Sequence, residues 1–390
     1  MRFFIPLMAF CAVVRAEQPN ILWITAEDMS ATLGCYGDKY ATTPNIDQLA
    51  TESVRYTKAF ASAPVCSPSR SCLITGCYPP SLSTQQMRSG FAIPKGMRGF
   101  PARLRAHGFY TSNNVKTDYN TSNYADIIKH SWDDSSATAH WRKRPDRAQP
   151  FFSIFNLMTT HQSRTMVWPY AKFKTEVQAK LSPGEIHDPA KVPLPPYYPD
   201  TPLIRREVAR FYDCVTAMDK EVGTILQQLE DDGLAENTIV IYSSDQGFYI
   251  GDHGWYDKRW MYEESLMMPF IVHWPGVTKP GSRDQHLIQN LDYAETFLDI
   301  AGAKIPADMQ GASLVPLLRG QDPKNWRTSI YYHYYEYPSV HMIPRHYGIR
   351  TERYKLMHFY QFGNEWELYD LQSDPDELQN LYGNKSTAKL

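Results

Sequence analysis

The sequence predicts an α/β fold in which buried parallel strands are flanked by helices. Three apolar runs, at residues 19–25, 151–158 and 237–244, are short and continuous rather than alternating with polar residues. Such runs are typical of parallel strands that are covered on both faces. Segments with helical spacing of apolar residues lie between the runs. We therefore expect strands and helices to alternate along the chain.

Polar residues follow each predicted strand. Glu27 and Asp28 come directly after the first run, His161 lies just beyond the second, and Asp245 follows the third. Each of these residues alone is equally typical of an exposed loop. In open α/β sheets, however, ligands bind at the carboxyl ends of the strands. The shared placement therefore predicts one site that contains all four.

Helices are predicted in the two longest intervals between these strands. Thr43 and Pro44 have the pattern of an N-cap and a first helical turn. Residues 182–201 contain six prolines, which exclude regular helix and central strand and favour a surface excursion. A long amphipathic helix is predicted from about residue 203 to residue 231, and we expect it to pack against the sheet.

The first residues resemble a secretory signal. Arg2 precedes an apolar run at residues 3–14, and Val14-Arg15-Ala16 fits a cleavage site. The run is shorter than the about 20 residues that span a bilayer. We expect residues 1–16 to be removed and the protein to be secreted, periplasmic or lysosomal, without stable membrane insertion. The alternatives are an uncleaved anchor and a buried N-terminal segment.

The balance of charge limits the classes of partner. The chain of 390 residues has 40 Lys and Arg against 42 Asp and Glu, a formal net charge of −2. This balance argues against a generic polyanion binder. The sequence also lacks a basic run and the aromatic-plus-basic pattern of nucleic-acid modules, so we expect no nucleic-acid partner. The 43% hydrophobic content fits a globular protein with a large core.

One short motif suggests chemistry on an anion. Cys66-Ser67-Pro68-Ser69-Arg70 begins a predicted helical turn that ends at Gly76. The amino end of a helix presents free N–H groups and a partial positive charge, which suit an anionic ester. Arg70, one turn further on, can place a guanidinium group against the same anion. Taken alone, Cys66 fits a structural or disulfide-bonded cysteine equally well.

This motif, with Leu73-Ile74-Thr75-Gly76 after it, resembles the signature of the type I sulfatases, in which the Cys of Cys-x-Pro-x-Arg is oxidised to Cα-formylglycine. The resemblance covers about residues 19–382. Its ordered segments are residues 19–29, 42–70, 240–276, 291–302, 311–320, 348–359 and 366–381. It implies an alkaline-phosphatase-like fold, with a mixed, mostly parallel central sheet flanked by helices. It also implies a catalytic domain at residues 17–325 and a small C-terminal α+β subdomain with an antiparallel sheet at residues 326–390.

The resemblance implies the chemistry of sulfate ester hydrolysis. The formylglycine aldehyde hydrates, one hydroxyl attacks sulfur, and the second allows the sulfate to be expelled. A divalent cation is implied, calcium first and magnesium second, because the ligands are all oxygen atoms. A formylglycine-generating enzyme or anaerobic maturase is the implied partner. The implied ligands are Glu27, Asp28, Asp245, Gln246 and residue 66 itself.

Four further residues receive roles from the resemblance. Arg70 and Lys116 would pair with the formylglycine oxygens, Lys258 with the sulfate, and His161 with the bridging oxygen as general acid. From the residues alone, the two lysines would be exposed surface charges. Many sulfatases carry a His two positions after the lysine that corresponds to Lys116, where this chain has Asp118. We expect Asp118 to accept the proton during sulfate release, or to contact the substrate.

The substrate is suggested by the C-terminal region. Five tyrosines lie among residues 331–337, in a segment that resembles the glucosamine-6-sulfatase and heparan-type branches of the family. We expect a sulfated carbohydrate, from a glycosaminoglycan or another polysaccharide, because aromatic faces suit sugar rings. Equally, these tyrosines can belong to an antiparallel sheet packed on the main domain. The residues expected to bind substrate are Gln86, His253, His341, Arg345 and His346.

Two other functions stay open. A phosphodiesterase or phosphonate hydrolase of the same superfamily can use a similar site. Because Asp118 replaces the usual His, a sulfoglycan-binding protein of impaired activity is the second alternative.

The cysteines do not help to choose among these functions. With Cys11 removed and Cys66 converted, an even number remains, which permits three pairings and requires none. These four are Cys35, Cys72, Cys77 and Cys214.

Overall fold

The computed structural model describes residues 18–195 and 197–387. Its largest element is an eight-stranded sheet with the order β11-β2-β10-β7-β1-β6-β4-β5. At its centre β1 (Asn20–Ala26) pairs in parallel with β6 (Phe151–Leu157) and with β7 (Thr238–Ser244). The three apolar runs therefore form the three adjacent central strands, as predicted.

The outer strands make the sheet mixed. On one side β4 (Tyr110–Asn114) pairs in parallel with β6 and with β5 (Asp134–Ser135). On the other side β10 (Phe270–His273) is antiparallel to β7 and to β2 (Val54–Tyr56), and β11 (Ser282–Asp284) is parallel to β2. The mixed, mostly parallel sheet confirms the predicted fold class.

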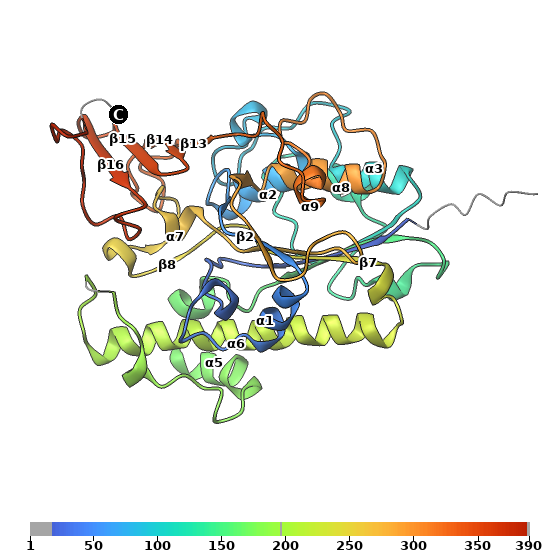
Figure 1. The fold of residues 1–390 in the computed structure, drawn as a ribbon, viewed down its shortest axis with the longest axis horizontal. Coiled ribbons are helices and arrows are strands. Elements are labelled where there is room, and N and C mark those ends of the chain that lie inside the picture. Colours follow the sequence, from blue (N-terminus) through green and yellow to red (C-terminus); the bar gives the residue numbers. More distant parts are fainter. Residues whose placement is uncertain (1–17, 196, 388–390) are drawn as a thin grey trace, which may run out of the picture.

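Helices cover both faces of this sheet (Figure 1). One face carries α2 (Cys66–Thr75), α3 (Phe100–Ala106) and α8 (Asp292–Ile300). The other carries α1 (Pro44–Thr51) and the long α6 (Pro202–Asp231). In β1, Trp23 packs toward α8 while the neighbouring Leu22 lies in the core on the α6 side. A strand buried on both faces needs apolar residues at every position, which explains the continuous run.

Both α1 and α6 begin close to the predicted residues, but the predicted N-cap of α1 does not form. In α6 the hydroxyl of Thr201 accepts a hydrogen bond from the backbone N–H of Ile204. In α1 the hydroxyl of Thr43 makes no capping bond. The Asp219 carboxylate on α6 accepts the N–H groups of Asn45 and Ile46 instead, at 3.1 and 2.8 Å. A residue from a distant helix therefore caps α1.

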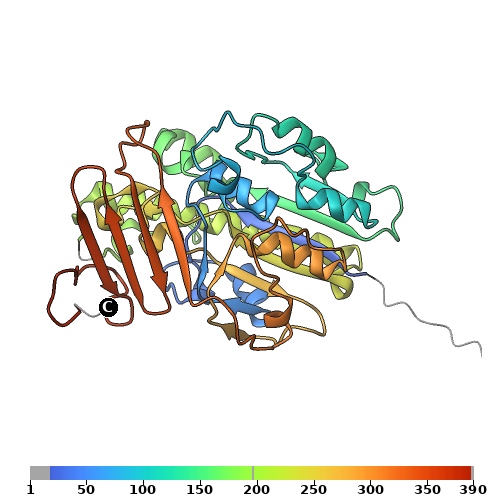
Figure 2. The ribbon, with the colours of Figure 1, turned by 90° about the horizontal axis from the view of Figure 1, so that it is seen from above.

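The C-terminal part forms a separate antiparallel sheet of four strands beside the main body (Figure 2). Its strands are β13 (Ser329–Tyr334), β14 (His346–Thr351), β15 (Tyr354–Phe359) and β16 (Glu365–Asp370). Tyr332 and Met357 from this sheet share an apolar cluster with Val65 and Trp260 of the main body. The sheet therefore packs directly on segments that carry the candidate site.

Smaller elements complete the fold. They are α4 (Tyr124–Ser131), α5 (Tyr170–Glu176), α7 (Glu263–Leu266), α9 (Val315–Leu318), β3 (Ala59–Phe60), β8 (Tyr249–Ile250), β9 (Tyr256–Asp257) and β12 (Ile288–Gln289). The predicted signal peptide, residues 1–16, lies outside the described residues. Among the helices that are described, none is long and apolar enough to cross a bilayer. Cys35, Cys72, Cys77 and Cys214 are free thiols, so the structure contains none of the permitted pairings among them.

Candidate active site

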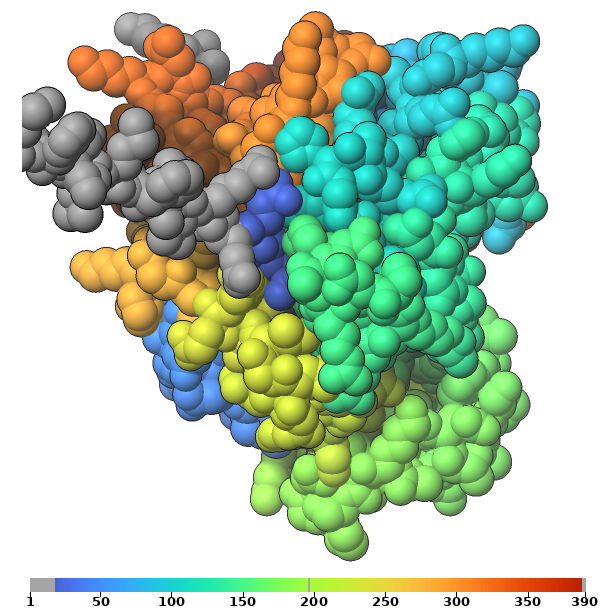
Figure 3. Space-filling model, turned by 90° about the vertical axis from the view of Figure 1, so that its right-hand side faces the viewer, coloured from blue at the N-terminus to red at the C-terminus, as the bar shows by residue number. Residues whose placement is uncertain are grey.

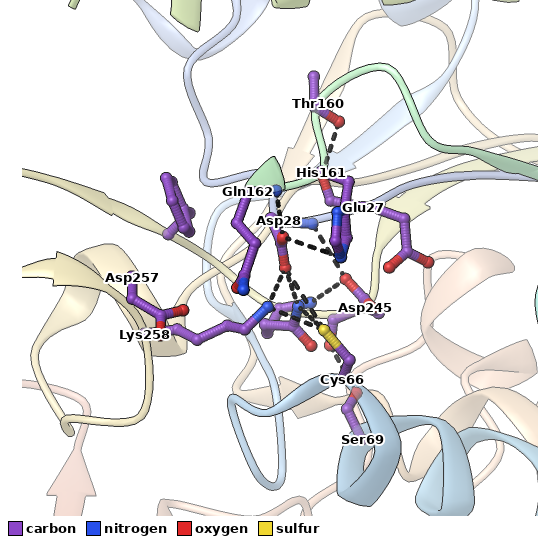
Figure 4. A network of polar contacts seen from close by, with 12 residues as sticks. Glu27, Asp28, Cys66, Ser69, Thr160, His161, Gln162, Asp245, Asp257 and Lys258 are labelled. Atoms are coloured by element: carbon purple, nitrogen blue, oxygen red, sulfur yellow. Dashed lines mark hydrogen bonds and ion pairs between the residues drawn. The ribbon is translucent and has the colours of Figure 1, made fainter. Parts of the chain in front are cut away.

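The carboxyl ends of the central strands meet the amino end of α2 (Figure 4). Glu27 and Asp28 follow β1, Asp245 follows β7, and Cys66 is the first residue of α2. One ligand atom from each of these four residues lies within 4.8 Å of those of the others. The three carboxylates are fully buried. The structure thus brings together residues that are more than 200 positions apart in the sequence.

The Cys66 thiol lies among polar groups. Its Sγ is 2.8 Å from Lys258 Nζ, 3.5 Å from Gln246 Nε2 and 3.7 Å from an oxygen of Asp28. Burial raises the pKa of the thiol to about 12, although Lys258 acts in the opposite direction. Since the thiolate is the nucleophilic form, an unmodified cysteine here is a weak nucleophile at neutral pH.

Lys258 is held by a strained loop. Both of its neighbours, Asp257 and Arg259, have φ near 93°, a conformation that side chains other than glycine rarely adopt. Arg259 donates to Asp257, and His341 lies 2.7 Å from Arg259 Nη2 and 3.2 Å from the Asp257 carboxylate. Lys258 itself donates to Asp28. Burial lowers the pKa of Lys258, but the nearby Asp28, Cys66 and Asp257 together more than offset it, so this pKa lies above its ordinary value and the amine stays charged.

Arg70 and Lys116 surround Glu27. Arg70 Nη1 donates to Glu27 Oε1 at 3.0 Å, and the Lys116 amine donates to the other oxygen. Arg70 also donates to the carbonyls of Lys116 and Thr117 at 2.8 and 2.9 Å, and to the Asn156 side chain. Burial alone would raise the pKa of Glu27, but Lys116 and Arg70 hold it below its ordinary value.

The remaining oxygen atoms of the cluster suit a hard cation. Burial, and then the charge of Glu27, raise the pKa of Asp245 well above its ordinary value. Asp245 Oδ2 and Gln246 Oε1 are buried and have no hydrogen-bond partner among the described residues. Buried polar atoms are nearly always paired, so these two require a partner. Carboxylate and amide oxygens are the ligands that Ca²⁺ and Mg²⁺ prefer, and the donor set therefore fits such an ion.

His161 and Asp118 lie at the edge of this cluster. His161 Nε2 is 4.0 Å from an Asp28 oxygen, and its Nδ1 lies 2.9 Å from the Ser163 hydroxyl. Burial lowers the pKa of His161 below its ordinary value. Asp118 is exposed, with φ of 48°, and directly follows the carbonyl of Thr117 that Arg70 holds.

The sequence reasoning missed several residues that hold the site together. The Ser69 hydroxyl donates to the carbonyl of Asp245 at 2.6 Å, and Asn290 Nδ2 donates to the Ser69 hydroxyl at 2.8 Å. Thr160 donates to the carbonyl of Glu27 at 2.6 Å, and the N–H of Gln162 donates to Asp28 at 2.7 Å. Thr160 and Gln162 could have been suspected as neighbours of His161. Nothing in the sequence marks Asn290, which lies 221 residues from Ser69.

The residues expected to bind substrate are scattered. His346 is fully buried in β14, beside Trp260 and Phe359, so it is a core residue and the prediction that it contacts substrate is wrong. His253 stacks on Tyr262 at 4.2 Å and lies 3.3 Å from Glu264. These contacts place it under the C-terminal sheet rather than beside Cys66.

The other three lie at the surface or support loops. Gln86 is exposed, and its carbonyl accepts the side chain of Asn120. Arg345 donates to the carbonyl of Tyr337 at 3.3 Å. His341 contacts Arg259 and Asp257 and so supports the loop that carries Lys258.

Two of the cavities lined by the described residues bear on the predicted site residues. One, of about 330 Å³, is lined by residues 331–335 together with Gln85 and Val65, so Gln85 rather than Gln86 faces a cavity. The other, of about 670 Å³, lies at the opposite edge of the sheet, where the start of β1 is seen between later segments (Figure 3). None of the predicted site residues lines this second cavity.

Comparison with known proteins agrees with the resemblance. A family model described as "Sulfatase" matches residues 19–303, and one described as "N-sulphoglucosamine sulphohydrolase, C-terminal" matches residues 251–390. The chain is 29% identical to an N-acetylglucosamine-6-O-sulfatase of Bacteroides thetaiotaomicron, over 98% of this chain and 86% of that protein. It is 33% identical to an ulvan-active sulfatase of Formosa agariphila, over 96% of this chain and 66% of that protein.

Solved structures give the same assignment. A structure in complex with its substrate D-glucosamine-2-N,6-O-disulfate has a TM-score of 0.77 and 28% identity, and covers 95% of both chains. A phosphonate monoester hydrolase of Agrobacterium radiobacter has a TM-score of 0.78 over 95% of this chain and 93% of the other. At 19% identity that second likeness shows the fold alone. The chain belongs to the sulfatase family of the alkaline phosphatase superfamily, and its activity is that of a sulfatase.

Proposed function

We propose that the protein removes sulfate from a sulfated carbohydrate, through residue 66 matured from Cys to formylglycine and a divalent cation beside it. One observation carries the proposal most directly: Lys258 Nζ lies 2.8 Å from Cys66 Sγ, inside a cluster of buried carboxylates. A buried, uncharged thiol has little nucleophilic power, whereas the hydrate of formylglycine would supply hydroxyl groups at the same position.

The cation would be held by the carboxylates of Glu27, Asp28 and Asp245, the amide oxygen of Gln246 and residue 66. Ca²⁺ is our first choice and Mg²⁺ the second, since the donors are oxygen atoms and the site offers more than two carboxylates. When bound, it would supply Lewis acidity toward the sulfate oxygens and the nucleophile. The unpaired oxygens of Asp245 and Gln246 support this assignment.

The protein's own cations would stabilise the negative charge of the sulfate. Lys258 stays protonated because Asp28 and its other negative neighbours together offset the effect of burial on its pKa, and its amine is already directed at residue 66. Arg70 and Lys116 are fixed by Glu27, so they hold their positions without reorganisation during the reaction. Preorganised donors of this kind are usually the largest single contribution to catalysis.

Two residues would move protons. We assign His161 to the bridging oxygen, to which it would give a proton as the sugar alcohol leaves. We assign Asp118 to the second hydroxyl of residue 66, from which it would take a proton as sulfate departs. In support, His161 lies 4.0 Å from Asp28, and Asp118 follows the loop that Arg70 holds.

The proposal of a carbohydrate substrate is based mainly on similar proteins. The names of two of them, an N-acetylglucosamine-6-O-sulfatase and an ulvan-active sulfatase, both specify sulfated carbohydrates. Aromatic side chains at residues 331–335 around a cavity next to residue 65 agree with a sugar ligand. We accordingly propose a glycosaminoglycan or another sulfated polysaccharide fragment as substrate.

Three further proposals accompany this one. We infer from residues 1–16 that the protein is exported, and that maturation requires a formylglycine-generating enzyme or an anaerobic maturase. We also propose residues 17–325 as the catalytic domain and residues 326–390 as a subdomain. Edman sequencing of the exported protein would begin at Glu17 if the first inference holds.

The function is tested by release of inorganic sulfate from sulfated oligosaccharides, with the protein matured and loaded with Ca²⁺. We expect release that the Cys66→Ala variant lacks. A phosphonate monoester and a phosphate diester serve as control substrates. Faster hydrolysis of either control than of every sulfated sugar would contradict the proposal in favour of the hydrolases that share the fold.

A further inference from the structure

His161 is joined to a short chain of polar contacts within its own loop, which follows β6. The Ser163 hydroxyl lies 2.9 Å from His161 Nδ1, and the Ser163 backbone N–H donates to the same nitrogen at 3.3 Å. Arg164 Nη1 in turn donates to the Ser163 hydroxyl oxygen at 3.0 Å. One nitrogen of the imidazole ring is therefore engaged by the residue two positions further along the chain.

The donors in this chain of contacts fix where the hydrogen atoms lie. A guanidinium N–H and a backbone N–H can only donate, whereas a hydroxyl group has one hydrogen and two lone pairs. Arg164 occupies one lone pair of Ser163 Oγ, which leaves the hydroxyl hydrogen for His161. With both the hydroxyl and the backbone N–H of Ser163 directed at Nδ1, the neutral ring carries its hydrogen on Nε2.

The same hydroxyl also suits the protonated ring. When Nδ1 carries a hydrogen, it donates to the second lone pair of Ser163 Oγ, and the hydroxyl hydrogen turns away. A carboxylate partner, which only accepts, would instead draw the hydrogen of the neutral ring to Nδ1. With Ser163 as the partner, Nε2 bears a hydrogen in both states of the ring.

The other nitrogen faces the reactive centre. His161 Nε2 is 4.0 Å from an oxygen of Asp28, and Figure 4 shows the ring beside Asp28. The backbone is fixed here, because the N–H of Gln162 donates to the same Asp28 oxygen at 2.7 Å. The ring could still turn, since the χ2 torsion of histidine has broad minima. The contact with Ser163 holds the orientation in which Nε2 is directed inward.

Arg164 is itself held in place. Its guanidinium group lies 4.0 Å from the centre of the Trp168 ring, a cation–π contact. The buried Arg210 on α6 donates to the backbone carbonyls of Arg164 and Trp168. The contacts thus run from α6 through Arg164 and Ser163 to His161, and a ring held in this way needs little reorganisation during a reaction.

We propose that Ser163, oriented by Arg164, is a positioning residue for His161: it keeps a hydrogen on Nε2 and directs that N–H at the bridging oxygen of the substrate. The inference rests on the proposed function, which assigns His161 to this oxygen. When the S–O bond breaks, its electron pair stays on the bridging oxygen, which takes the Nε2 proton of the protonated ring. The ring is left neutral, with its remaining hydrogen donated to Ser163.

The kinetics of Ser163→Ala test this role. We expect kcat for a sulfated sugar to fall by at least about tenfold, because the acid is no longer aligned in the transition state. KM should change little, since the substrate does not lose a contact in the ground state. Ser163→Thr keeps the hydroxyl and should recover most of kcat. Ser81→Ala is the matched control, since Ser81 is exposed on the turn at residues 79–82.

Three kinetic results would overturn the proposal. Unchanged kcat in Ser163→Ala would show that the hydroxyl does not act on His161. A Ser163→Thr variant as slow as Ser163→Ala would point to packing rather than to the hydroxyl. An equal loss of kcat in Ser81→Ala would show that the effect is not specific to this loop.

NMR of the ring nitrogens separates this inference from the proposed function. In matured, Ca²⁺-loaded protein labelled with ¹⁵N-histidine, two-bond correlations report which ring nitrogen of His161 bears the hydrogen, and His161→Gln identifies the signal. We expect the hydrogen of the neutral ring on Nε2. A neutral ring with its hydrogen on Nδ1 would overturn the positioning role, whether or not sulfate is released. If no sulfated sugar loses sulfate while the hydrogen lies on Nε2, the proposed function fails and the inferred arrangement of Ser163 and His161 is supported.

Discussion

At the scale of single residues, two of the three buried carboxylates of the site form ion pairs with buried or partly buried cationic side chains. Glu27 has Arg70 and Lys116, and Asp28 has Lys258. Asp245 has no such cationic partner among the described residues, and burial raises its pKa well above the ordinary value. An unpaired buried carboxylate is costly unless it is neutralised or binds a cation. The asymmetry among the three carboxylates is therefore itself an argument for a metal at Asp245.

A cation bound at Asp245 predicts two effects of its removal. Chelation should abolish sulfate release and also lower the melting temperature, because the bound ion stabilises only the folded state. At about 100 times its dissociation constant, Ca²⁺ would add about 2.7 kcal/mol to the free energy of unfolding. Differential scanning fluorimetry with and without Ca²⁺ measures this effect. Unchanged melting, in a sample shown to be free of metal, would exclude the site.

Asp118 gives a second prediction at this scale. Asp118→Asn should lower kcat by about 10²–10⁴-fold, because the amide cannot accept the proton that general base catalysis requires. Asn also tolerates the positive φ of 48° at this position, so the backbone should be kept. Stopped-flow burst kinetics then show whether the release of sulfate is the slowed step. Unaltered turnover and unaltered burst would rule out the assignment.

The sequence could predict the residues that a motif or a strand end marks. Cys66, Arg70, Asp28 and Asp245 all come together as expected. Asn290 could not be predicted from the sequence, because its contact with Ser69 depends on how α8 and α2 pack, and no local sequence pattern encodes that packing.

At the scale of elements, the alternation of side chains along β14 explains why His346 is buried and not available to a substrate. In β14 the buried positions are His346, Gly348 and Arg350, whereas Ile349 is 40% exposed. The inward face thus carries polar residues and the outward face an apolar one, the reverse of the usual pattern. Burial lowers the pKa of His346 to about 4, so it is neutral within the sheet. From sequence alone this histidine had the features of a surface residue.

The turn after β7 supplies a prediction about how Gln246 is fixed. The N–H of Gly247 donates to the carbonyl of Ser265 at 2.9 Å, and a Cβ at Gly247 would lie 1.9 Å from the carbonyl oxygen of Glu264. Gly247→Ala must therefore displace backbone, at a cost of about 1–3 kcal/mol, and should reduce activity by moving Gln246. Gly184→Ala is the control, since a Cβ there meets nothing within 4 Å.

Urea unfolding and sulfate release report the two effects. We expect the control to match wild type in both. If Gly247→Ala is as stable and as active as Gly184→Ala, the close approach to Glu264 does not constrain the site.

At the scale of the whole molecule, buried ion pairs connect the C-terminal sheet to α7 of the main body. Lys355 on β15 is fully buried and lies 2.9 Å from Glu263 of α7 and 2.8 Å from Glu377. Arg350 on β14 adds a further contact to Glu263 at 3.0 Å. The strained loop around Lys258 ends at Arg259, and α7 begins four residues later at Glu263, so the C-terminal sheet contacts the chain just beyond Lys258. Such a long-range contact could not be predicted, because the pattern of each strand describes only its own burial.

Glu295 on α8 predicts how stability depends on pH. It is 1% exposed, and burial raises its pKa from an ordinary 4.5 to about 8. The folded state therefore binds this proton more tightly than the unfolded state does. The contribution is complete below pH 4.5 and is lost as pH rises toward 8, so the free energy of unfolding should fall across this range.

Glu295→Gln should flatten that decline. One carboxylate oxygen accepts the N–H of Gly311 at 2.6 Å, and the glutamine carbonyl can replace it. Chemical denaturation at a series of pH values measures the slope, with the exposed Glu230→Gln on α6 as control. Equal slopes in both variants would show that Glu295 does not titrate in this range.

The proposed chemistry depends on the chemical identity of residue 66. Mass spectrometry of the peptide that contains this residue, on the same sample whose sulfate release is measured, tests it most directly. We predict that the peptide carries an aldehyde in place of the thiol, and that activity rises in proportion to the aldehyde fraction. Full sulfate release from protein whose residue 66 is an intact cysteine would contradict the account.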